Sequence, residues 1–528
     1  MRVVKASEMA FADENTIKLT GIPSLVLMEN AGRTSAEIIL EKYKNQNKFC
    51  IVAGTGNNGG DGIVIARYLK KYGKDVTVLI LSQTRKKLSQ DNLKNLEIFE
   101  TMEGKVLLID EEKIAKLRNE IKNADVIIDA IFGTGFKPPV KGYRGKVIEI
   151  INRYAKNVVS VDIPSGLSTD TGEIFEPFIK ADLTTTFAYP KLAHILYPAS
   201  QYCGDVFVID ISIDENYLKE LKRFLIEGKE LQLPKREKNS HKYTYGHTLV
   251  IGGSKGKSGA VIMASKSAAY AGSGLVTAVI PESINTVVET NLIEEMSIPV
   301  DDYNGLFGRK ASKEIKEIIK NGKFSSIVVG MGMSINNNTT SLIEQILKIK
   351  LPMVMDADGL NNLAKIPDFE KILIKRKQPT VLTPHIGEMS RLTGISTSEI
   401  NKNMEEVAKQ FSQKTKTYVV LKSSRTVIAT PDGKIFYSIK GNEGMATAGT
   451  GDVLAGILGS LLNRLPVEEG LKTGVYLHGL SGDLAVKEKG VESLQATDLI
   501  EFIPEAYEEI SSMKQKVDTK FYKCLCQI

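Results

Sequence analysis

The stretch KFCIVAGTGNNGGDG, residues 48–62, decides the fold of the first part of this chain. Residues 48–54 form a short apolar run that is typical of a buried strand. The glycine-rich residues 54–62 follow it and open a predicted helix. Glycines let a backbone approach a ligand closely, and free N–H groups at a helix start attract phosphate. The loop matches neither the dinucleotide fingerprint nor a lysine-bearing phosphate loop. The loop either binds a ligand or is only a tight turn between strand and helix. Its Asn and Asp residues favour a ligand-binding loop.

The same alternation of strand and helix continues through the first 210 or so residues. It predicts a doubly wound parallel sheet, in which ligands bind beyond the carboxyl ends of the strands. The predicted strands are 48–54, 75–81, 124–133 and 157–164, and the predicted helices are 61–72, 89–103 and 144–155.

A charged segment, residues 216–240, interrupts this pattern and contains Pro234. Strand–helix alternation then restarts, and residues 417–439 are predicted to form two strands and a hairpin at Pro431-Asp432-Gly433. We therefore expect an α/β protein of two three-layer domains, the first Rossmann-like. The predicted parts are a first domain, 1–215, a junction, 216–240, a second domain, 241–505, and a tail, 506–528. Further strands are predicted at 247–254, 275–281, 325–332, 352–359 and 380–384, with a helix at 258–272.

The composition is that of an ordinary globular chain, with 42% hydrophobic and 25% charged residues. The net charge of +6 is small for 528 residues, and no basic block is interleaved with aromatics, so we expect no nucleic-acid partner. No apolar run approaches the roughly 20 residues of a membrane helix, and the N-terminus lacks a signal core. The four cysteines suit a reducing compartment, which predicts a cytoplasmic protein without a membrane partner. The closely spaced Cys524 and Cys526 are only a weak indication of a metal or redox site.

Polar residues also follow two other strands of the first domain. DAIFGTGFKPP, residues 129–139, begins with Asp129 and contains Lys137, and VDIPSG, residues 161–166, contains Asp162 and Ser165. Each motif alone could be a helix cap or a turn. Three polar strand ends in one parallel sheet predict a site.

In this order and spacing, NNGGDG, DAIFGTGFK and VDIPSG resemble the YjeF N-terminal domain, the NAD(P)H-hydrate epimerase, over about residues 1–215. The resemblance implies epimerisation at C6 of a hydrated nicotinamide ring, with Asp162 as the acid/base. It implies potassium bound by Asn58, Asp129 and Ser165. Messenger-RNA decapping scaffolds share this fold and provide a non-enzymatic alternative. The implied substrate- and phosphate-binding residues are Asn57, Asn58, Gly59, Gly60, Asp61, Gly133, Thr134, Gly135, Phe136, Lys137, Pro138, Pro139 and Asp162.

In the second half, MATAGTGDVLAG, residues 445–456, places small residues and Asp452 directly before an apolar helical run. Free N–H groups at that helix start can stabilise negative charge, and an aspartate can accept a nucleophile's proton. A simple helix cap is the alternative. His385 and Glu388 follow another predicted strand, where His385 is either a ligand or a structural histidine and Glu388 can stabilise a helix N-terminus. The loop GGSKGKSGA, residues 252–260, binds an anion or is only a solvated turn.

LTPHIGE, LKSSRTVIATPDG and GMATAGTGDVLAGILG resemble the ribokinase-like YjeF C-terminal domain, the ADP- or ATP-dependent NAD(P)H-hydrate dehydratase, over about residues 240–505. The resemblance implies that phosphorylation of the ring hydroxyl and elimination restore the nicotinamide, with ADP the usual nucleotide in bacterial and archaeal members, and with Mg²⁺. Asp452 is the implied catalytic residue. The implied substrate-binding residues are Ala260, Gly332, His385 and Asp452, and the implied nucleotide-binding residues are Lys422, Ser423, Ser424, Arg425, Thr426 and Gly451.

The chain departs from the usual dehydratase pattern at Ser423, Glu443 and Ala448. Glu443 adds a negative charge near the expected phosphates, so the sequence leaves the choice between ADP and ATP open. Together the two resemblances predict one repair pathway, in which hydrated NADH and NADPH are epimerised and then dehydrated, by a homo-oligomer. A ribokinase-like kinase of a vitamin precursor is the enzymatic alternative, although it does not account for the first half of the chain.

Overall fold

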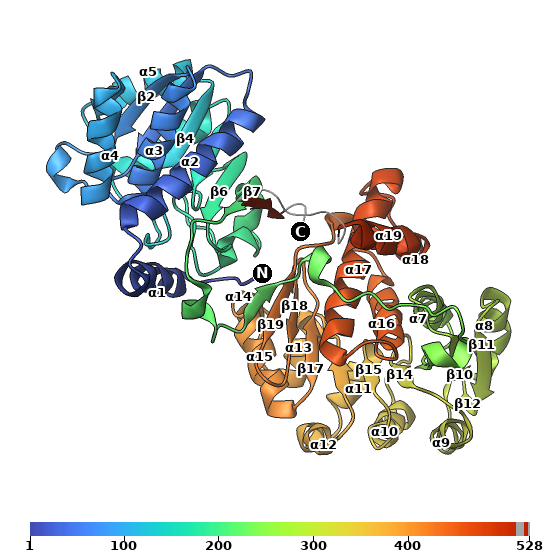
Figure 1. Ribbon diagram of the computed structural model, residues 1–528. Coiled ribbons are helices and arrows are strands. Elements are labelled where there is room, and N and C mark those ends of the chain that lie inside the picture. The colour runs from blue at the N-terminus through green and yellow to red at the C-terminus, as the bar shows by residue number, and fades with distance from the viewer. Residues whose placement is uncertain (514–521, 526–528) are drawn as a thin grey trace. The chain divides into compact units, whose positions relative to one another are not determined.

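The computed structural model describes residues 1–513 and 522–525, and the chain folds into two compact units (Figure 1). The first unit comprises Met1–Arg223 together with the C-terminal strand β20, and the second begins at Phe224. The division falls inside the predicted junction, 216–240. Residues 506–513 of the predicted tail belong to helix α19 of the second unit. Cys526 lies outside the described residues.

An eight-stranded sheet forms the centre of the first unit, in the order β20-β7-β6-β5-β4-β1-β2-β3. Strands β1 to β7 are parallel, and β20 pairs antiparallel with β7 at one edge. The strands are β1 (Lys48–Ala53), β2 (Asp75–Ile80), β3 (Lys105–Leu108), β4 (Val126–Ala130), β5 (Val158–Val161), β6 (Leu183–Phe187), β7 (Asp205–Ile209) and β20 (Tyr522–Cys524).

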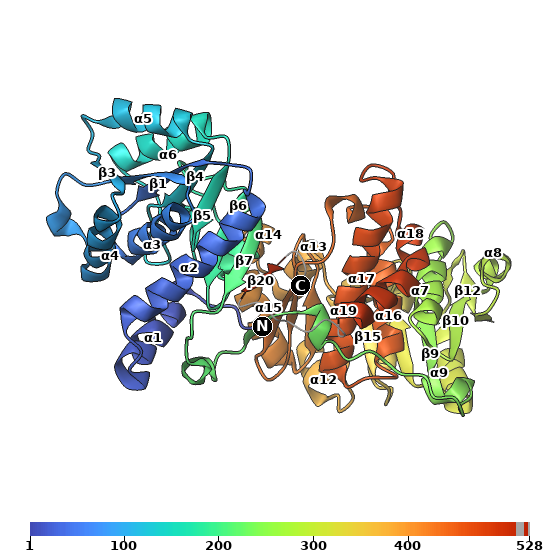
Figure 2. The same ribbon diagram turned by 45° about the horizontal axis from the view of Figure 1, so that its top comes forward.

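Helices cover both faces of this sheet, as Figure 2 shows. Phe49, Ile51 and Ala53 of β1 pack in one core with α2, α3 and α4, and Cys50 and Val52 pack in another with α5 and α6. Because alternate side chains of a strand point to opposite faces, β1 is apolar along its whole length. The helices are α1 (Ala6–Asn15), α2 (Ser24–Lys42), α3 (Asn57–Lys71), α4 (Gln90–Thr101), α5 (Ile114–Asn123) and α6 (Tyr143–Tyr154).

A ten-stranded sheet forms the centre of the second unit, in the order β11-β10-β9-β14-β15-β16-β17-β18-β19-β8. The strands from β11 to β17 in this order are parallel, whereas β18 is antiparallel to both β17 and β19. A separate two-stranded sheet pairs β12 (Asp302–Tyr303) with β13 (Leu306–Phe307). The strands of the large sheet are β8 (Arg223–Leu225), β9 (His247–Ile251), β10 (Leu275–Pro281), β11 (Met296–Val300), β14 (Ser326–Val329), β15 (Met353–Met355), β16 (Thr380–Leu382), β17 (Tyr418–Leu421), β18 (Thr426–Ala429) and β19 (Ile435–Ser438).

Helices also cover both faces of the second sheet. Helices α7 and α16 to α19 share one apolar core with the sheet, and α15 packs on β17 and β18. Figure 1 shows α16 and α17 on one face and α9, α10 and α12 on the other. The helices are α7 (Ser258–Tyr270), α8 (Asn285–Asn291), α9 (Ala311–Asn321), α10 (Asn337–Ile346), α11 (Asp358–Leu363), α12 (Phe369–Lys375), α13 (Ile386–Thr393), α14 (Thr397–Lys402), α15 (Met404–Thr415), α16 (Thr450–Leu461), α17 (Val467–Lys489), α18 (Ala496–Glu501) and α19 (Ile503–Met513).

The predicted fold class, two α/β domains of three layers, is confirmed. One local prediction was wrong, because residues 417–439 form three strands, β17, β18 and β19, rather than two. The hairpin at Pro431-Asp432-Gly433 joins β18 to β19, and Gly433 has the positive φ, 85°, that such a turn requires. The extra turn, between β17 and β18, contains four of the predicted nucleotide-binding residues, Lys422 to Arg425.

No helix among residues 1–513 and 522–525 has both the length and the apolar composition needed to span a membrane.

The contact between α7 and α16 depends on Gly456. A Cβ on Gly456 would lie 2.1 Å from both the Ala264 carbonyl oxygen and the Ser267 hydroxyl. We expect Gly456→Ala to lower the free energy of unfolding of the second unit by about 1–3 kcal/mol. Gly470→Ala on α17 is the control, since its nearest neighbouring atom would be 3.4 Å away. Hydrogen exchange of the α7 and α16 amides measures the effect, and equal protection in both variants would contradict it.

Candidate active sites

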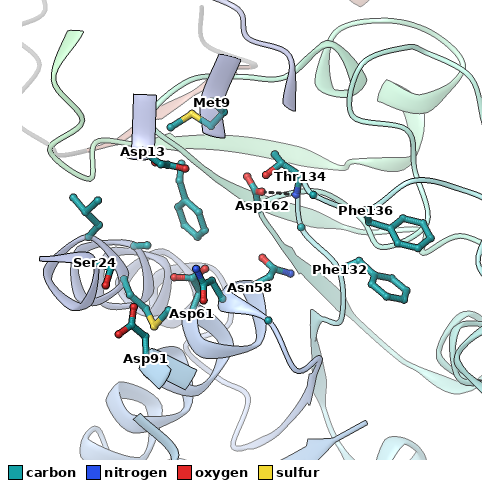
Figure 3. A pocket seen from close by; sticks show the side chains of 18 of the residues that line it. Met9, Asp13, Ser24, Asn58, Asp61, Asp91, Phe132, Thr134, Phe136 and Asp162 are labelled. Carbon is teal, nitrogen blue, oxygen red and sulfur yellow. Dashed lines mark hydrogen bonds between the residues drawn. The ribbon is translucent and has the colours of Figure 1, made fainter. Parts of the chain in front are cut away.

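A cavity of about 540 Å³ lies at the carboxyl end of the first sheet (Figure 3). Its walls come from α1 and α2 and from the segments that follow β1, β4, β5 and β6. The carboxyl ends of parallel strands meet at one edge, which is why motifs distant in sequence converge here.

Glycines let the loop after β1 pass close to its neighbours. A Cβ on Gly54 would lie 2.1 Å from the Ile131 carbonyl oxygen, and one on Gly59 would lie 2.2 Å from the Gly54 carbonyl oxygen. The Asn92 side chain of α4 supports the loop by donating to the carbonyls of Gly54 and Gly56, at 3.2 and 2.9 Å. These contacts leave the first turn of α3 facing the cavity.

Asp162 follows β5 and has a positive φ of 69°, which is uncommon for a residue other than glycine. Its carboxylate accepts hydrogen bonds from the Lys191 ammonium at 2.7 Å, the Thr134 backbone N–H at 3.1 Å and the Thr186 hydroxyl at 3.2 Å. His194 donates from Nε2 to the Asp162 carbonyl at 3.0 Å, because its Nδ1 accepts the Lys191 backbone N–H. Asp162 is therefore held at both its carboxylate and its backbone.

The carboxyl groups in this cavity differ in their ionisation. Burial alone would raise the pKa of Asp162, but the Lys191 ammonium and its hydrogen bond lower that pKa below the usual range. Burial raises the pKa of Asp61 well above its usual value, with the Asp162 and Asp13 carboxylates adding to the effect. Burial likewise raises the pKa of Asp13 to about 6. Burial, followed by the Lys191 charge, lowers the pKa of His194 to about 3, so that its imidazole is neutral.

The structure brings many of the predicted epimerase residues together around the cavity. Those that line it are Asn57, Asn58, Asp61, Gly133, Thr134, Gly135, Phe136 and Asp162. Gly59, Gly60, Lys137, Pro138 and Pro139 lie outside the lining, and Lys137 is exposed.

Of the three predicted potassium ligands, Asn58 lines the cavity, whereas Asp129 and Ser165 lie outside its lining. Asp129 is buried and accepts from the Ser165 hydroxyl at 2.6 Å and from the Ser160 hydroxyl at 2.9 Å. Burial raises its pKa, although the Ser165 and Ser160 hydrogen bonds oppose that shift. Both amide atoms of Asn58 are buried without a hydrogen-bond partner among the described residues. The set is composed of oxygen ligands of the kind that hard cations prefer.

Sequence reasoning missed Lys191, His194 and Asp13 as members of this site. Lys191 follows β6 and is buried, with 1% of its surface exposed. A buried lysine needs a partner, but no local pattern distinguishes it from a solvated one. Asp13 lies on α1, a helix that the strand–helix pattern did not predict.

In the second unit, a polar cluster forms at the carboxyl ends of β15 to β17. The Lys422 ammonium, after β17, donates to the buried Asp356 carboxylate, after β15, at 2.5 Å. A Cβ on Gly451 would lie 3.1 Å from the Lys422 Nζ and 3.5 Å from the Asp356 Oδ2. The start of α16 therefore lies against this ion pair. Burial, then the Asp356 carboxylate, raises the pKa of Asp452 to about 7.

His385 and Glu388 belong to the same cluster. The His385 Nδ1 accepts the Gly387 N–H at 2.9 Å, and a Glu388 oxygen accepts the His385 N–H at 2.9 Å, so the two residues cap the start of α13. Burial, followed by the Lys422 charge, lowers the pKa of His385, and burial raises the pKa of Glu388 to about 7. His385 pairs as a parallel bridge with Lys422, which brings α13 next to the ion pair.

The remaining predicted dehydratase residues fall in two places. Gly332 and Ala260 are adjacent, since a Cβ on Gly332 would lie 3.1 Å from that of Ala260. Ser423, Ser424, Arg425 and Thr426 follow Lys422 in the turn before β18 and at its start; Ser423 and Ser424 are exposed, and Arg425 donates to the Ile439 carbonyl at 2.8 Å.

Two α/β units, each with buried carboxyl groups and glycines at the carboxyl edge of its own sheet, are typical of an enzyme with a candidate site in each unit. Residues 24–193 match the family described as YjeF-related protein N-terminus, and residues 248–505 match the NAD(P)H-hydrate dehydratase family. The bifunctional NAD(P)H-hydrate repair enzyme Nnr of Moorella thermoacetica is 38% identical, with 98% of each chain covered. That of Thermofilum pendens is 36% identical, with 96% of each chain covered.

Among solved structures, an ADP/ATP-dependent NAD(P)H-hydrate dehydratase from Bacillus subtilis is similar to 54% of this chain and 96% of its own, with 29% identity and a TM-score of 0.47. The full-length relatives decide the classification. The chain belongs to the family of bifunctional NAD(P)H-hydrate repair enzymes.

The contribution of the Lys191–Asp162 pair to the stability of the first unit can be tested by substitution. Lys191→Met leaves Asp162 buried and unpaired, so we expect the first unit to lose about 3–5 kcal/mol at pH 7. Adding Asp162→Asn should restore most of that loss. The pKa of Asp162 is lower in the folded protein than its usual value of 3.8. The pair therefore stabilises the fold above pH 3.8, and this contribution is lost as the pH falls from 3.8 through the lowered pKa. Hydrogen exchange of the β5 and β6 amides at pH 7 compares the wild type with Lys191→Met, and equal protection in the two would contradict the prediction.

Proposed function

We propose that this chain repairs hydrated NADH and NADPH in two steps, with one step in each unit. The first unit interconverts the R and S hydrates at C6, and the second dehydrates the S hydrate in a nucleotide-dependent reaction. The observation that carries the proposal is that each sheet has its own carboxyl group beside glycine-rich backbone, Asp162 in one unit and Asp452 in the other.

In the first unit, Asp162 is the acid/base. It lines the cavity, and Lys191 keeps it ionised in the free protein, so that it can accept a proton from a hydroxyl or a water at C6. The loops Asn57–Asp61 and Gly133–Pro139 hold the phosphate-bearing part of the substrate. Backbone N–H groups at the start of α3 supply the hydrogen-bond donors for an anion.

A potassium ion is the proposed cation of the first unit, bound by Asn58, Asp129 and Ser165. The unpartnered Asn58 Oδ1 is the atom that favours a ligand at this position. When bound, the ion supplies positive charge beside the loop that follows β4. Asn58 contacts that loop, because a Cβ on Gly133 would lie 3.2 Å from the Asn58 Oδ1.

In the second unit, Asp452 accepts the proton of the ring hydroxyl while that oxygen takes a phosphoryl group. Phosphorylation converts hydroxide, a poor leaving group, into phosphate, whose elimination restores the dihydronicotinamide. The first N–H groups of α16 have no intrahelical acceptors and lie beside Lys422, so they can stabilise the charge on the transferred group. Lys422 to Thr426 and Gly451 bind the nucleotide, and Ala260, Gly332 and His385 contact the hydrate.

ADP is the proposed nucleotide, with Mg²⁺. No group of three His, Cys, Asp or Glu side chains in the described part of the chain is arranged to hold a metal. Mg²⁺ is commonly bound by one or two carboxylates together with substrate phosphates, so we infer that it enters with the nucleotide.

The three departures from the usual dehydratase motif, Ser423, Glu443 and Ala448, are all exposed. The effect of Glu443 on nucleotide choice is testable with Glu443→Pro.

A cytoplasmic location and a homo-oligomeric state are part of the proposal. The free thiols of Cys50 and Cys203 are buried, which suits a reducing compartment. Sedimentation of the purified chain tests the oligomeric state.

Two substitutions test the division of labour. Asp452→Asn should abolish dehydration and leave exchange between the hydrate epimers, because only the second unit loses its base. Asp162→Asn should do the reverse, so that the S hydrate alone is consumed. Recovery of the near-ultraviolet absorbance of NADH with ADP or ATP measures dehydration, and chromatography of the epimers measures exchange. Loss of both activities in both variants would contradict two independent sites, and no recovery with either nucleotide would contradict the dehydratase.

The ionisation of Asp452 predicts the pH dependence of dehydration. Since burial raises its pKa to about 7, the base is increasingly protonated below that pH. We expect kcat/KM for the S hydrate to fall about tenfold per pH unit below pH 6 and to level above pH 8. The measurement uses a fixed, saturating nucleotide concentration. A flat profile between pH 5.5 and pH 8.5 would contradict Asp452 as the base.

A further inference from the structure

Of the two buried carboxyl groups that line the epimerase cavity, Asp61 and Asp162, Asp61 is the one that makes no hydrogen bond among the described residues. It lies in α3, it is 9% exposed, and it lines the cavity. No hydrogen bond to its carboxyl forms within residues 1–513 and 522–525. A buried carboxylate without a hydrogen bond or a cation is costly, so such a group is retained in its neutral form.

Asp162 lines the same cavity and is also buried, but it differs from Asp61 in its hydrogen bonds. It accepts from Lys191, Thr134 and Thr186, and all of these are bonds that favour a carboxylate. Figure 3 shows the two carboxyl groups on different walls of the cavity, Asp61 on α3 and Asp162 on the segment after β5. Of the two buried carboxyl groups in this cavity, one is therefore held by hydrogen bonds and a cation, and the other is not.

The charges that face Asp61 from the surrounding elements are mostly negative. They are Asp13 of α1, Asp91 of α4 and Asp162, which raise its pKa together with burial, and Lys191, which opposes them. Lys191 makes its closest hydrogen bond to Asp162 and also donates to Thr186 and the Phe187 carbonyl. On α2, Glu29 pairs with Arg67 at 2.7 Å. Arg144 of α6 lies over the Phe132 ring, 5.7 Å from its centroid.

The resemblance groups Asp61 with the residues of a phosphate-binding loop, and the protonation state of its carboxyl group decides what it can contact. An ionised carboxyl group would repel a phosphate, whereas a neutral one offers an O–H donor to an oxygen in the cavity. The hydroxyl on C6 of the proposed substrate is such an oxygen.

We propose that Asp61 is the proton donor of the epimerase, protonating the C6 hydroxyl while Asp162 serves as the base at the other face of the ring. This assignment rests on the proposed function of the first unit. It makes Asp61 and Asp162 a pair of catalytic residues with opposite starting protonation.

The Asp61 proton moves to the C6 oxygen, the C6–O bond breaks, and water leaves. The lone pair on the ring nitrogen forms a double bond to C6. A second water then adds to the opposite face of C6, its proton passes to Asp162, and the nitrogen recovers its lone pair. The product is the other epimer, Asp61 is ionised and Asp162 is protonated.

That product state is the starting state for the reverse reaction, with the two roles exchanged. Proton exchange with solvent through the cavity returns the resting state. The scheme needs no oxidant, reductant or further reactant. It predicts that each epimerisation replaces the C6 oxygen with one from water.

The experiment uses the full-length wild-type chain and Asp61→Asn, in water enriched in oxygen-18. In the wild type, we expect one labelled oxygen per epimerisation and a rate that falls at alkaline pH as Asp61 ionises. Asp61→Asn is isosteric and neutral, so we expect the epimerisation kcat to fall 10²–10⁴-fold with KM changed less than threefold. The residual rate should lose the alkaline fall.

Asp75→Asn is the matched control, since Asp75 is exposed at the beginning of β2, away from the cavity lining. It should epimerise at the wild-type rate. Dehydration of the S hydrate should be unchanged in both variants, and circular dichroism should show that Asp61→Asn melts no lower than the wild type.

Three results would overturn the assignment: Asp61→Asn within threefold of wild-type kcat, an alkaline fall that persists in that variant, or epimerisation without label in the wild type. The last measurement needs no variant and therefore does not depend on how Asp61→Asn folds. A wild-type chain that does not epimerise at any pH would instead contradict the proposed function of the first unit.

Discussion

Each of the two sites is organised around one lysine–aspartate pair, with a buried aspartate, at the carboxyl edge of a parallel sheet. In the first unit, the ammonium of Lys191 compensates Asp162, and in the second, that of Lys422 compensates Asp356. Removing one partner of such a pair leaves an uncompensated buried charge, which costs several kcal/mol. The positions of the neighbouring loops follow from the pairs. Thr134 of the loop after β4 donates to Asp162, and the start of α16 packs against Lys422 and Asp356.

The pairs also decide which carboxyl groups are free to exchange protons. One aspartate beside each lysine is compensated, while other carboxyl groups nearby are buried with less compensation. Those groups are Asp61 and Asp13 in the first unit and Asp452 and Glu388 in the second, and burial is the largest cause of the raised pKa in each. Carboxyl groups with separated pKa values in one site provide an acid and a base at neutral pH. The two units thus use the same electrostatic arrangement, although their sheets and motifs differ.

Much of the fold could be predicted from the sequence. Short Val- and Ile-rich runs marked β1, β2, β4 and β5 correctly, because a strand buried on both faces is apolar throughout. The pattern did not reveal α1, which is charged and carries Asp13, or β20, which lies far along the chain from the sheet that it joins. It also placed two strands where β17, β18 and β19 occur, since the turn at Lys422–Arg425 contains no glycine or proline to mark it.

For the sites, the sequence by itself determined some of the chemical groups. The loop at residues 54–62, the segment Gly133–Phe136 and Asp162 could be selected because glycines and polar residues at strand ends form a local pattern, and the structure places them around one cavity. Only the tertiary structure decided the state of each carboxyl group. Lys191 is 29 residues from Asp162, and Lys422 is 66 residues from Asp356. Ionisation depends on burial and on charges a few ångströms away in space, and neither is encoded in the spacing of residues along the chain.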